Sequence, residues 1–325
     1  MTPPIGRHHG TLKPTVDIVI VDYNAGSQVR ECLASIERCP PKPGRLSRVV
    51  VVDNASSVPT QECVRESALP LHFIRNEENC GFAAACNQGA IRSEADYLLF
   101  LNPDTILHEH SLSVPVAFLD ADSGQRYAAC GIQLVEDDGW IARSCARLPT
   151  PATMLTSILG LDRLLQRRFR GYRMREWPHD ETCDVDHVIG AFYFIRRPVF
   201  ESLGGFDERF FVYLEDLDLS LRIQKAGLRI RYLTSARAYH RGGGASERIK
   251  AFRLFLSLQS RLAYARKHFP ASAVWLVTFT TLAPECVTRL GRAVAMIRPS
   301  VVGETLRAYY LLWRWLIRGA RPGRP

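Results

Sequence analysis

Acidic side chains follow several apolar runs of the chain, where they could hold a charged ligand. The tetrapeptide Asn-Pro-Asp-Thr at 102–105 directly follows the apolar run 98–101, which places Asp104 on a loop at the carboxyl end of an expected strand. Mg²⁺ binds through one or two carboxylates when it keeps waters and contacts phosphate oxygens. The same tetrapeptide is an ordinary turn sequence. Asp104 is therefore a candidate metal ligand, with a turn residue as the alternative.

Two more acids end apolar runs earlier in the chain. Asp22 ends the run 16–21, and Asp53 ends the run 49–52. Ligands of doubly wound sheets bind at the carboxyl ends of the strands, so we expect both carboxylates in one crevice, where they could recognise a nucleotide. Helix capping would explain the same residues. The small residues of 79–89 open a helix and would let backbone approach a ligand, although a tight helix–sheet contact accounts for them equally.

The segment 213–222 contains three acids, Glu215, Asp216 and Asp218, at the expected start of an amphipathic helix. Acids in a first helical turn commonly only complement the helix dipole. Here the surrounding Phe and Leu residues would desolvate at least one carboxylate and make it a better general base. His240 precedes Arg-Gly-Gly-Gly and could complete a metal shell or contact a diphosphate, with a structural histidine as the alternative.

These residues need strands and helices that bring them to one edge of a sheet. Apolar runs at 16–21, 49–52, 71–74 and 97–101 are typical of buried parallel strands, and helical stretches lie between them at 26–38, 57–67 and 81–91. This alternation predicts an α/β fold with a doubly wound, mostly parallel sheet. The first strand is not followed by G-x-G-x-x-G, and the sequence contains no P-loop, so a nicotinamide dehydrogenase or a P-loop enzyme is disfavoured.

Charge is unevenly distributed along the 325 residues. The formal net charge is +9, but residues 247–325 contain 14 Lys and Arg against three Glu, a net +11, so the first 246 residues sum to −2. Such a basic segment could bind nucleic acid, anionic lipid or a phosphorylated acceptor. Nine cysteines without a C-x-x-C pair favour reduced thiols. The apolar run 271–283 is shorter than the ~20 residues that span a bilayer, so we expect no transmembrane helix.

In their order and spacing these segments resemble glycosyltransferase family 2, and most closely its bacterial rhamnosyltransferase-like branch. The similarity covers residues 16–246 and runs through 19–24, 51–57, 79–89, 101–105, 190–191, 204–208, 215–219 and His240. The resemblance implies a GT-A fold whose nucleotide-sugar site is lined by Asp22, Tyr23, Asn24, Asp53, Asn79, Gly81, Asn87 and Asn102.

The resemblance also implies Mg²⁺ or Mn²⁺ at Asp104 and His240, and Asp216 as the general base, with Glu215 as its competitor. Neighbouring residues of a helix point about 100° apart, so we expect Glu215 to face solvent or an acceptor contact. Two positions depart from the family pattern. Asn102 stands where many relatives have the first Asp of D-x-D, and His187 stands where this branch often has Trp.

The implied activity is inverting transfer of a sugar, with L-rhamnose from dTDP-L-rhamnose as the first choice, onto a hydroxyl of a lipid-linked or polysaccharide glycan precursor. UDP-N-acetylglucosamine, UDP-galactose and UDP-galactofuranose are alternative donors, because no residue identifies the sugar from first principles. A non-catalytic nucleotide-sugar-binding or scaffold protein is the alternative of another class. Nucleic acid is not an expected partner, since the basic tail lacks a recognised binding motif.

We expect three parts: a flexible N-terminus at 1–14, a catalytic domain at 15–246 with a nucleotide half at 15–135 and an acceptor half at 136–246, and a helical, basic tail at 247–325. In the tail, one helical stripe contains Leu306, Tyr309, Tyr310, Trp313 and Ile317. The stripe predicts attachment to an anionic membrane surface, with packing against the catalytic domain as the alternative. Because 1–14 lacks the apolar segment of a signal peptide, we expect a cytoplasmic protein, peripheral at the inner face of the plasma membrane.

Overall fold

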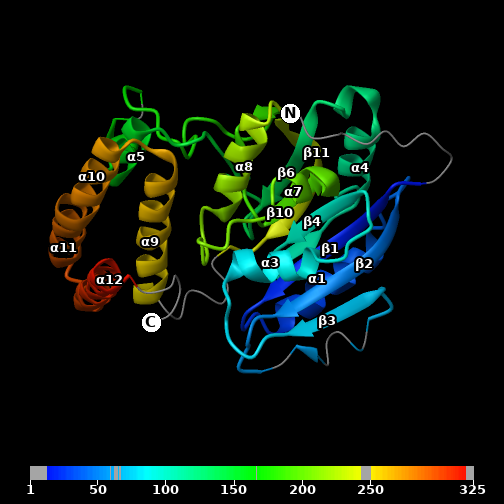
Figure 1. Ribbon diagram of the computed structural model, residues 1–325, viewed down its shortest axis with the longest axis horizontal. Helices are drawn as coiled ribbons and strands as arrows, with labels where there is room; N and C mark the ends of the chain where they lie inside the picture. The colour runs from blue at the N-terminus through cyan, green and yellow to red at the C-terminus, as the bar shows by residue number, and fades with distance from the viewer. Residues whose placement is uncertain are drawn as a thin grey trace.

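The computed structural model describes residues 13–319, except 59, 62–64, 66, 166 and 243–249. Of the N-terminal part expected at 1–14, all but the last two residues lie outside the described residues, as does part of the helix expected at 57–67. The described chain forms a central sheet covered by helices and a further group of helices beside it (Figure 1).

The four apolar runs of the first hundred residues form parallel strands, as predicted. They are β1 (Thr15–Asp22), β2 (Arg45–Asp53), β3 (Leu71–Arg75) and β4 (Tyr97–Leu101). Alternate residues of β1 face opposite sides of the sheet, with Ile18 and Ile20 in one apolar core and Val19 and Val21 in another. Both faces of the strand are buried, which explains why its sequence has almost no polar positions.

The second half of the sheet mixes strand directions. It contains β5 (Thr105–Leu107), β6 (Tyr127–Val135), β8 (Cys183–Val185), β10 (Phe192–Arg196) and β11 (Arg229–His240). The order is β3-β2-β1-β4-β10-β6-β11-β5, with β8 also paired to β11. Because β10 runs antiparallel to β4, its first residue Phe192 pairs with Leu101, and the segment before β10 reaches the carboxyl edge of the sheet. A separate two-stranded sheet pairs β7 (Cys145–Ala146) with β9 (His187–Val188).

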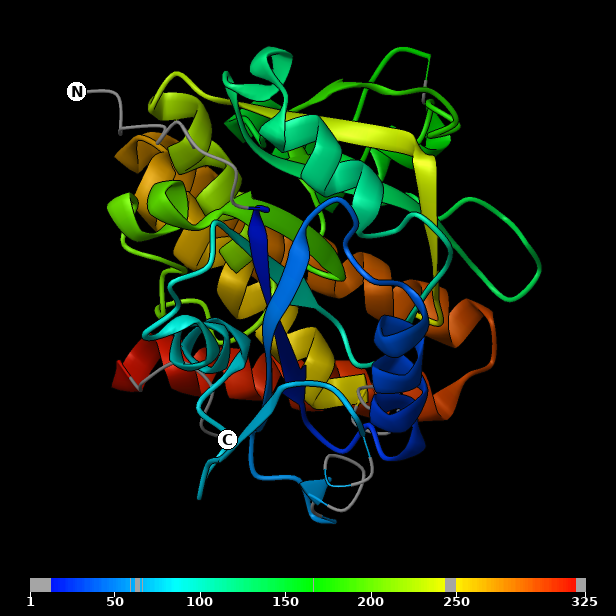
Figure 2. The same cartoon turned by 90° about the vertical axis from the view of Figure 1, so that its right-hand side faces the viewer.

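Helices cover both faces of the central sheet, as a doubly wound fold requires. One face packs against α1 (Ser27–Arg38) and α4 (Ser113–Asp120), which is followed by the 3₁₀ turn η1 (Asp122–Gly124). The other face packs against α3 (Phe82–Ala90), α7 (Arg197–Ser202) and α8 (Glu215–Lys225). Figure 2 shows the blue strands β1 and β2 running between α1 and α3.

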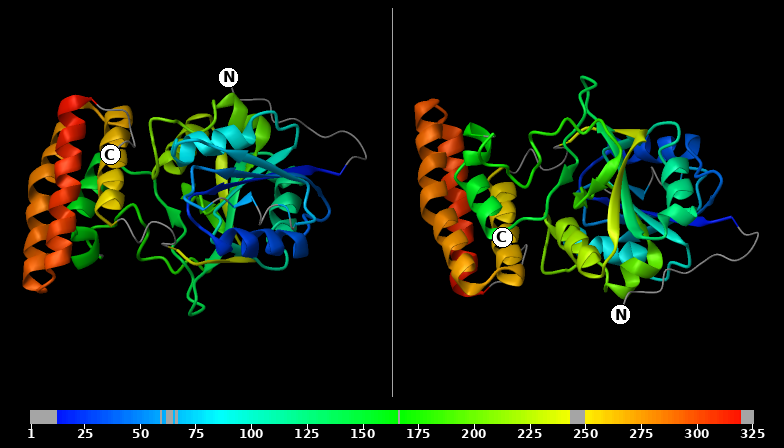
Figure 3. Two further views of the ribbon diagram at one scale, coloured as in Figure 1. Left: turned by 90° about the horizontal axis from the view of Figure 1, so that it is seen from below. Right: turned by 90° about the horizontal axis from the view of Figure 1, so that it is seen from above.

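The remaining helices form a second group around their own apolar core. They are α5 (Pro151–Ile158), α6 (Leu161–Leu164), α9 (Lys250–His268), α10 (Ala271–Thr280), α11 (Cys286–Ala295) and α12 (Pro299–Arg318), with the π-helical turn η3 (Thr281–Glu285) between α10 and α11. Figure 3 shows this group to one side of the sheet. Phe210 and Leu217 belong to the part of the chain that contains the central sheet. Both are buried in the same core as Leu258 of α9 and Leu312 of α12. This shared core joins the two parts.

The stripe expected on the last helix is exposed except at one position. Leu306, Tyr310, Trp313 and Ile317 are each 50–77% exposed, whereas Tyr309 is buried and donates to the Thr281 carbonyl at 3.0 Å. The prediction for Tyr309 is wrong, because α12 turns one face inward onto the core that it shares with α9. None of the helices in the described ranges combines the length and the apolar character that crossing a bilayer requires.

Candidate active site

Asp22 and Asp53 lie side by side at the carboxyl edge of the sheet, because β1 and β2 pair them in register. Neither side chain is exposed. Asp22 accepts hydrogen bonds from the Ala25 amide (2.9 Å) and the Thr60 hydroxyl (2.5 Å), and Asp53 pairs with Arg75 at 2.6 Å. Burial raises the pKa of Asp22, and its hydrogen bonds partly offset this effect. The two acids therefore organise the loops that follow β1 and β2.

Tyr23 and Asn24 are the predicted nucleotide-site residues that this edge exposes. Asn24 has a left-handed φ of 58°, a conformation that Asn tolerates better than most residues. Its Oδ1 accepts hydrogen bonds from the amide and the hydroxyl of Ser57, at 2.8 and 2.7 Å. The neighbouring Tyr23 ring is 39% exposed and can stack on a planar group. A nucleotide could therefore contact this loop directly.

The small residues of 79–89 serve close packing between the helix and its surroundings. A Cβ at Gly81 would lie 2.5 Å from the carbonyl oxygen of Phe211, and that oxygen accepts a hydrogen bond from the Phe82 amide at 2.6 Å. A Cβ at Gly89 would lie 2.4 Å from Val19 of β1. The tight helix–sheet contact considered from the sequence therefore accounts for Gly89, whereas at Gly81 the close approach is to the loop at Phe211.

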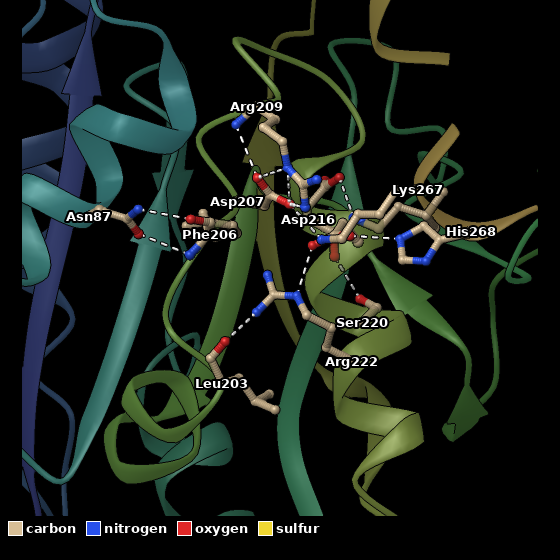
Figure 4. A network of polar contacts seen from close by, with 12 residues as sticks. Asn87, Leu203, Phe206, Asp207, Arg209, Asp216, Ser220, Arg222, Lys267 and His268 are labelled. Carbon is tan, nitrogen blue, oxygen red and sulfur yellow. Dashed lines mark hydrogen bonds and ion pairs between the residues drawn. The ribbon is translucent and has the colours of Figure 1, made fainter. Parts of the chain in front are cut away.

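Asn79 and Asn87 also hold loops together. Asn79 Oδ1 accepts hydrogen bonds from the Asn54 side chain and the Gly81 amide, both at 2.9 Å. Asn87 exchanges two hydrogen bonds of 2.9 Å with the backbone of Phe206 (Figure 4). These bonds tie the Gly-Gly-Phe-Asp-Glu turn to α3. Nucleotide contact by either asparagine stays a prediction.

Asn102, Asp104 and His240 meet because β11 pairs with β5 and sets His240 opposite Thr105. His240 Nε2 lies 3.4 Å from Asp104 Oδ1 and 3.5 Å from Asn102 Nδ2. The described ranges contain no group of three or more His, Cys, Asp or Glu side chains that could hold a metal. One carboxylate and one imidazole still fit a divalent cation that takes its other ligands from a diphosphate and water.

Asp216 lies in the first turn of α8, as predicted, and lines a cavity at the carboxyl edge of the sheet. Its Oδ2 accepts a hydrogen bond from the Gly190 amide and its Oδ1 from the Leu217 amide, both at 2.8 Å. A Cβ at Gly190 would lie 3.4 Å from Oδ2, so glycine leaves space for this approach. The side chain is 15% exposed, so the two amides orient a carboxylate that a ligand in the cavity can still reach.

Glu215 lines the same cavity but has a different environment. It is only 4% exposed, and its Oε2 has no hydrogen-bond partner among the described residues. Burial raises the pKa of Glu215 well above its ordinary value, and the adjacent Asp216 carboxylate raises it further. The expected position toward solvent is therefore wrong, while contact with an acceptor stays a prediction.

His187 lies next to Asp216 and also lines the cavity. Its Nε2 lies 3.8 Å from Asp216 Oδ2, and its Nδ1 lies 3.0 Å from the hydroxyl of Ser220, which also contacts the Tyr193 hydroxyl at 3.0 Å. Burial lowers the pKa of His187, although the nearby Asp216 opposes this effect. The buried imidazole therefore favours its neutral form beside the Asp216 carboxylate.

A cavity of about 790 Å³ connects these groups. Asn102 and His240 line it together with Glu215 and Asp216. Further lining residues come from the segment 143–175 and from α9. His240 of the candidate metal pair and the candidate base therefore face a common space, with Asp104 next to His240, and this space also extends to α9.

A charge network that sequence analysis missed connects α8 with α9 (Figure 4). The fully buried Asp218 contacts Arg222 at 2.8 Å, Lys267 at 2.5 Å and His268 at 2.7 Å, and Lys267 also pairs with Asp207 at 2.6 Å. Although burial opposes the charged form, hydrogen bonds from His268 and Lys267 lower the pKa of Asp218. The i, i+4 spacing of Asp218 and Arg222 was readable, whereas His268 lies 50 residues away in the chain.

The fold and site have counterparts among known proteins. The model of the family described as Glycosyl transferase family 2 matches residues 17–204, which is more than half of the chain. The chain therefore belongs to this family. The N-acetylglucosaminyl-diphospho-decaprenol L-rhamnosyltransferase of Mycobacterium tuberculosis is 28% identical over 236 residues, which cover 69% of this chain and 75% of that protein. The rhamnosyltransferase WbbL of Escherichia coli is 30% identical over 151 residues, which cover 46% of this chain and 53% of that protein. Within the family, the chain is rhamnosyltransferase-like.

A solved structure supports the predicted fold. The mannosyltransferase of Pyrobaculum calidifontis, in complex with GDP-Man and Mn²⁺, matches with a TM-score of 0.56 and 18% identity over 96% of this chain and 89% of that one. The predicted GT-A fold is thereby confirmed. At this identity the likeness concerns the fold, and function depends on the site.

Proposed function

We propose that this chain is an inverting glycosyltransferase that uses a nucleoside-diphosphate sugar and a divalent cation. The observation that carries the proposal is that Asp216, Asn102 and His240 line one cavity, with Asp104 next to His240. One donor and one acceptor bound in this cavity would then meet both a proton acceptor, Asp216, and a place for the leaving diphosphate beside His240. The Mn²⁺ in the related mannosyltransferase structure supports the choice of cation.

Asp216 accepts the proton of the acceptor hydroxyl, whose oxygen then attacks the anomeric carbon from the side opposite the diphosphate. The new glycosidic bond forms as the bond to the diphosphate breaks, so the configuration inverts. Asp104 and His240, with Asn102 beside them, would hold Mg²⁺ or Mn²⁺. The bound cation would neutralise the charge that develops on the departing nucleoside diphosphate.

Glu215 and Asp216 have different proposed tasks. Because burial raises its pKa, Glu215 keeps its proton to a higher pH than a free glutamate and is suited to donate a hydrogen bond to the acceptor. Asp216 is more exposed, and the Gly190 and Leu217 amides orient it. The desolvation expected from the sequence therefore falls on Glu215, and the proposal of Asp216 as the base rests on its access to the cavity and on the two amides that orient it.

The nucleotide is assigned to the carboxyl edge of β1 and β2. Asp22 and Asp53 hold the loops there, and Tyr23 and Asn24 are the side chains open to a ligand. For the sugar we propose L-rhamnose, supported by the two rhamnosyltransferase relatives. A UDP-sugar remains the alternative donor. The acceptor is proposed to be a hydroxyl of a lipid-linked or polysaccharide glycan precursor.

We further propose that residues 15–246 act as the catalytic domain and that the basic part at 247–325 rests on an anionic membrane surface, at the inner face of the plasma membrane. Large apolar side chains are exposed on α10, α11 and α12 and in the turn before α12: Trp275, Phe279, Val287, Ile297, Leu306, Tyr310, Trp313 and Ile317. Exposed apolar groups among basic residues are typical of interfacial attachment. The helices α5 and α6, although earlier in the chain, pack with this group.

A panel of nucleotide sugars tests the proposal. Purified protein with Mn²⁺ and a lipid-linked glycan acceptor is given dTDP-L-rhamnose, UDP-N-acetylglucosamine, UDP-galactose or UDP-galactofuranose, and release of nucleoside diphosphate is measured. We expect the fastest release from dTDP-L-rhamnose and none with EDTA. Asp138→Asn, an exposed change outside the cavity, is the matched control for Asp216→Asn. Faster release from a UDP-sugar would overturn only the donor, whereas a folded protein inactive on the whole panel would favour a non-catalytic binding protein.

A further inference from the structure

The cavity of the candidate active site carries arginines that the proposed mechanism does not use. Arg143, Arg173, Arg175 and Arg253 line it and are called the arginine cluster below. Among the described residues, no carboxylate lies within 4.0 Å of the guanidinium groups of Arg143, Arg173 or Arg253. Arg175 lies 3.9 Å from Asp162, and its Nε has no hydrogen-bond partner in the same described ranges. Arg173 Nε does donate a hydrogen bond to the Tyr172 hydroxyl at 3.3 Å, but within the described ranges this part of the cavity lining carries more positive charge than nearby carboxylates pair with.

Backbone pairing sets Arg143 near the proposed base. The carbonyl of Ser144 accepts a hydrogen bond from the Ile189 amide at 2.9 Å, and the next residue, Gly190, donates to Asp216 at 2.8 Å. The arginine and the amide that orients the base thus lie on adjacent segments, which continue as β7 and β9. A ligand that contacts Asp216 can therefore also contact the arginine cluster.

Arg173 and Arg175 lie just after Tyr172, whose backbone is hydrogen-bonded to Arg147, the residue that follows β7. The Tyr172 carbonyl accepts a hydrogen bond from the Arg147 amide at 2.7 Å. Burial lowers the pKa of Arg175, and the positive charges of neighbouring arginines lower it further. Crowded guanidinium groups repel one another, and a bound anion would relieve this repulsion.

The last member of the cluster comes from α9. Arg253, Ser257 and Arg261 recur every four residues and all line the cavity, so one face of α9 borders it. Arg261 is neutralised by Glu285, but Arg253 has no such partner among the described residues. The proposed catalytic domain and helix α9 therefore both contribute positive charge to the wall of the cavity.

We propose that the arginine cluster binds a phosphate or diphosphate group of the acceptor while the acceptor hydroxyl reaches Asp216. The inference rests on the proposed transferase function. The donor diphosphate is assigned to Asp104 and His240, where a cation would neutralise it, so the arginines form a second anion site. Guanidinium groups suit this task because their planar fork of N–H donors pairs with two phosphate oxygens at once.

Binding experiments without divalent cation test the cluster apart from the donor site. Geranyl diphosphate, inorganic pyrophosphate and the uncharged geraniol are titrated into the full-length protein by calorimetry. We expect the two anions to bind and geraniol not to bind. Arg143→Ala, Arg175→Ala and Arg253→Ala should each weaken anion binding about 10-fold, the effect of losing one charged hydrogen bond. Arg307→Ala, exposed on α12 and outside the cavity lining, is the matched control and should bind as the wild type does.

The probes distinguish the two sources of phosphate. Tighter binding of geranyl diphosphate than of pyrophosphate, with the same dependence on arginine, would identify a lipid-linked acceptor. Equal binding of both would identify recognition of the phosphate groups alone, as in a soluble sugar phosphate. Wild-type affinity in all three alanine variants, or equal binding of geraniol, would overturn the inference.

Binding of dTDP with Mn²⁺ is measured in parallel, so that the donor site is tested separately. If the arginine variants lose dTDP binding and keep anion binding, the cluster belongs to the donor site and the inference is wrong. If the wild type binds neither dTDP nor any other nucleoside diphosphate, the proposed transferase function fails instead. Thermal unfolding of each variant verifies that it is folded.

Discussion

Replacing Asp216 with Asn removes the proposed proton acceptor while keeping the size of the side chain. Loss of a general base typically lowers kcat by about 10²- to 10⁴-fold, or ~3–5 kcal/mol of activation free energy. The structure adds a separate cost. The Gly190 and Leu217 amides donate to different carboxylate oxygens, each at 2.8 Å. An asparagine has one acceptor oxygen, so one amide would face an NH₂ group, which costs about 1–3 kcal/mol of unfolding free energy.

These two effects are measured by different assays. Steady-state release of nucleoside diphosphate in the presence of acceptor gives kcat, titration with dTDP gives donor affinity, and thermal unfolding gives stability. We expect Asp216→Asn to lose turnover and some thermal stability and to keep its donor affinity. Glu215→Gln should be milder, because glutamine retains a hydrogen-bond donor at the buried position. An inactive Glu215→Gln beside a folded, nearly fully active Asp216→Asn would refute the reasoning and move the base by one residue.

The remaining predictions concern the cation, the buried charge network and the helical tail. Asp104→Ala should abolish sugar transfer and the response to Mn²⁺, and full turnover by this variant or by metal-stripped enzyme would leave Asp104 as a turn residue. Asp218→Asn should lower the unfolding free energy by about 3–5 kcal/mol, because it leaves buried cations without their partner. Since the folded state lowers the pKa of Asp218, this stabilisation is present above about pH 4, the unfolded pKa, and is lost as the pH falls through the folded pKa. Unfolding measured from pH 7 to pH 3 should therefore show a smaller acid-dependent loss for the variant than for the wild type, and equal losses would contradict the assignment. In flotation with phosphatidylglycerol vesicles, Trp313→Ser and Ile317→Ser should reduce salt-sensitive binding. Trp140→Ser should not, because Trp140 is also exposed but lies next to β6 of the central sheet. Undiminished binding of the two tail variants would place the membrane contact elsewhere.

The local sequence was sufficient to predict the parallel strands and the start of α8. The apolar runs that end at Asp22 and Asp53 are buried on both faces, and a doubly wound sheet is the arrangement that buries such runs. The acids at 215–218 mark the first turn of a helix through the helix dipole, which also acts over a few residues. These features depend on neighbours in the chain, so a single sequence contains them.

The sequence does not indicate whether Glu215 or Asp216 is the buried acid. Glu215 and Asp216 are adjacent and chemically alike, yet Glu215 is enclosed without a hydrogen-bond partner among the described residues, and Asp216 meets the amide of Gly190 from a distant segment. The same limit applies to Asn87, whose hydrogen bonds hold the turn at Phe206, 119 residues away.

The class of fold, the family resemblance and the polar residues at the ends of the strands could be predicted before folding was considered. Which of these groups share a cavity, the inward position of Tyr309, and the place of Arg143 and Arg253 beside Asp216 became clear only from the folded chain. The two kinds of information differ in the distance over which they act. Strand and helix patterns reflect backbone and solvent effects within a few residues, whereas desolvation and charge pairing depend on distances between segments that meet only when the chain is folded.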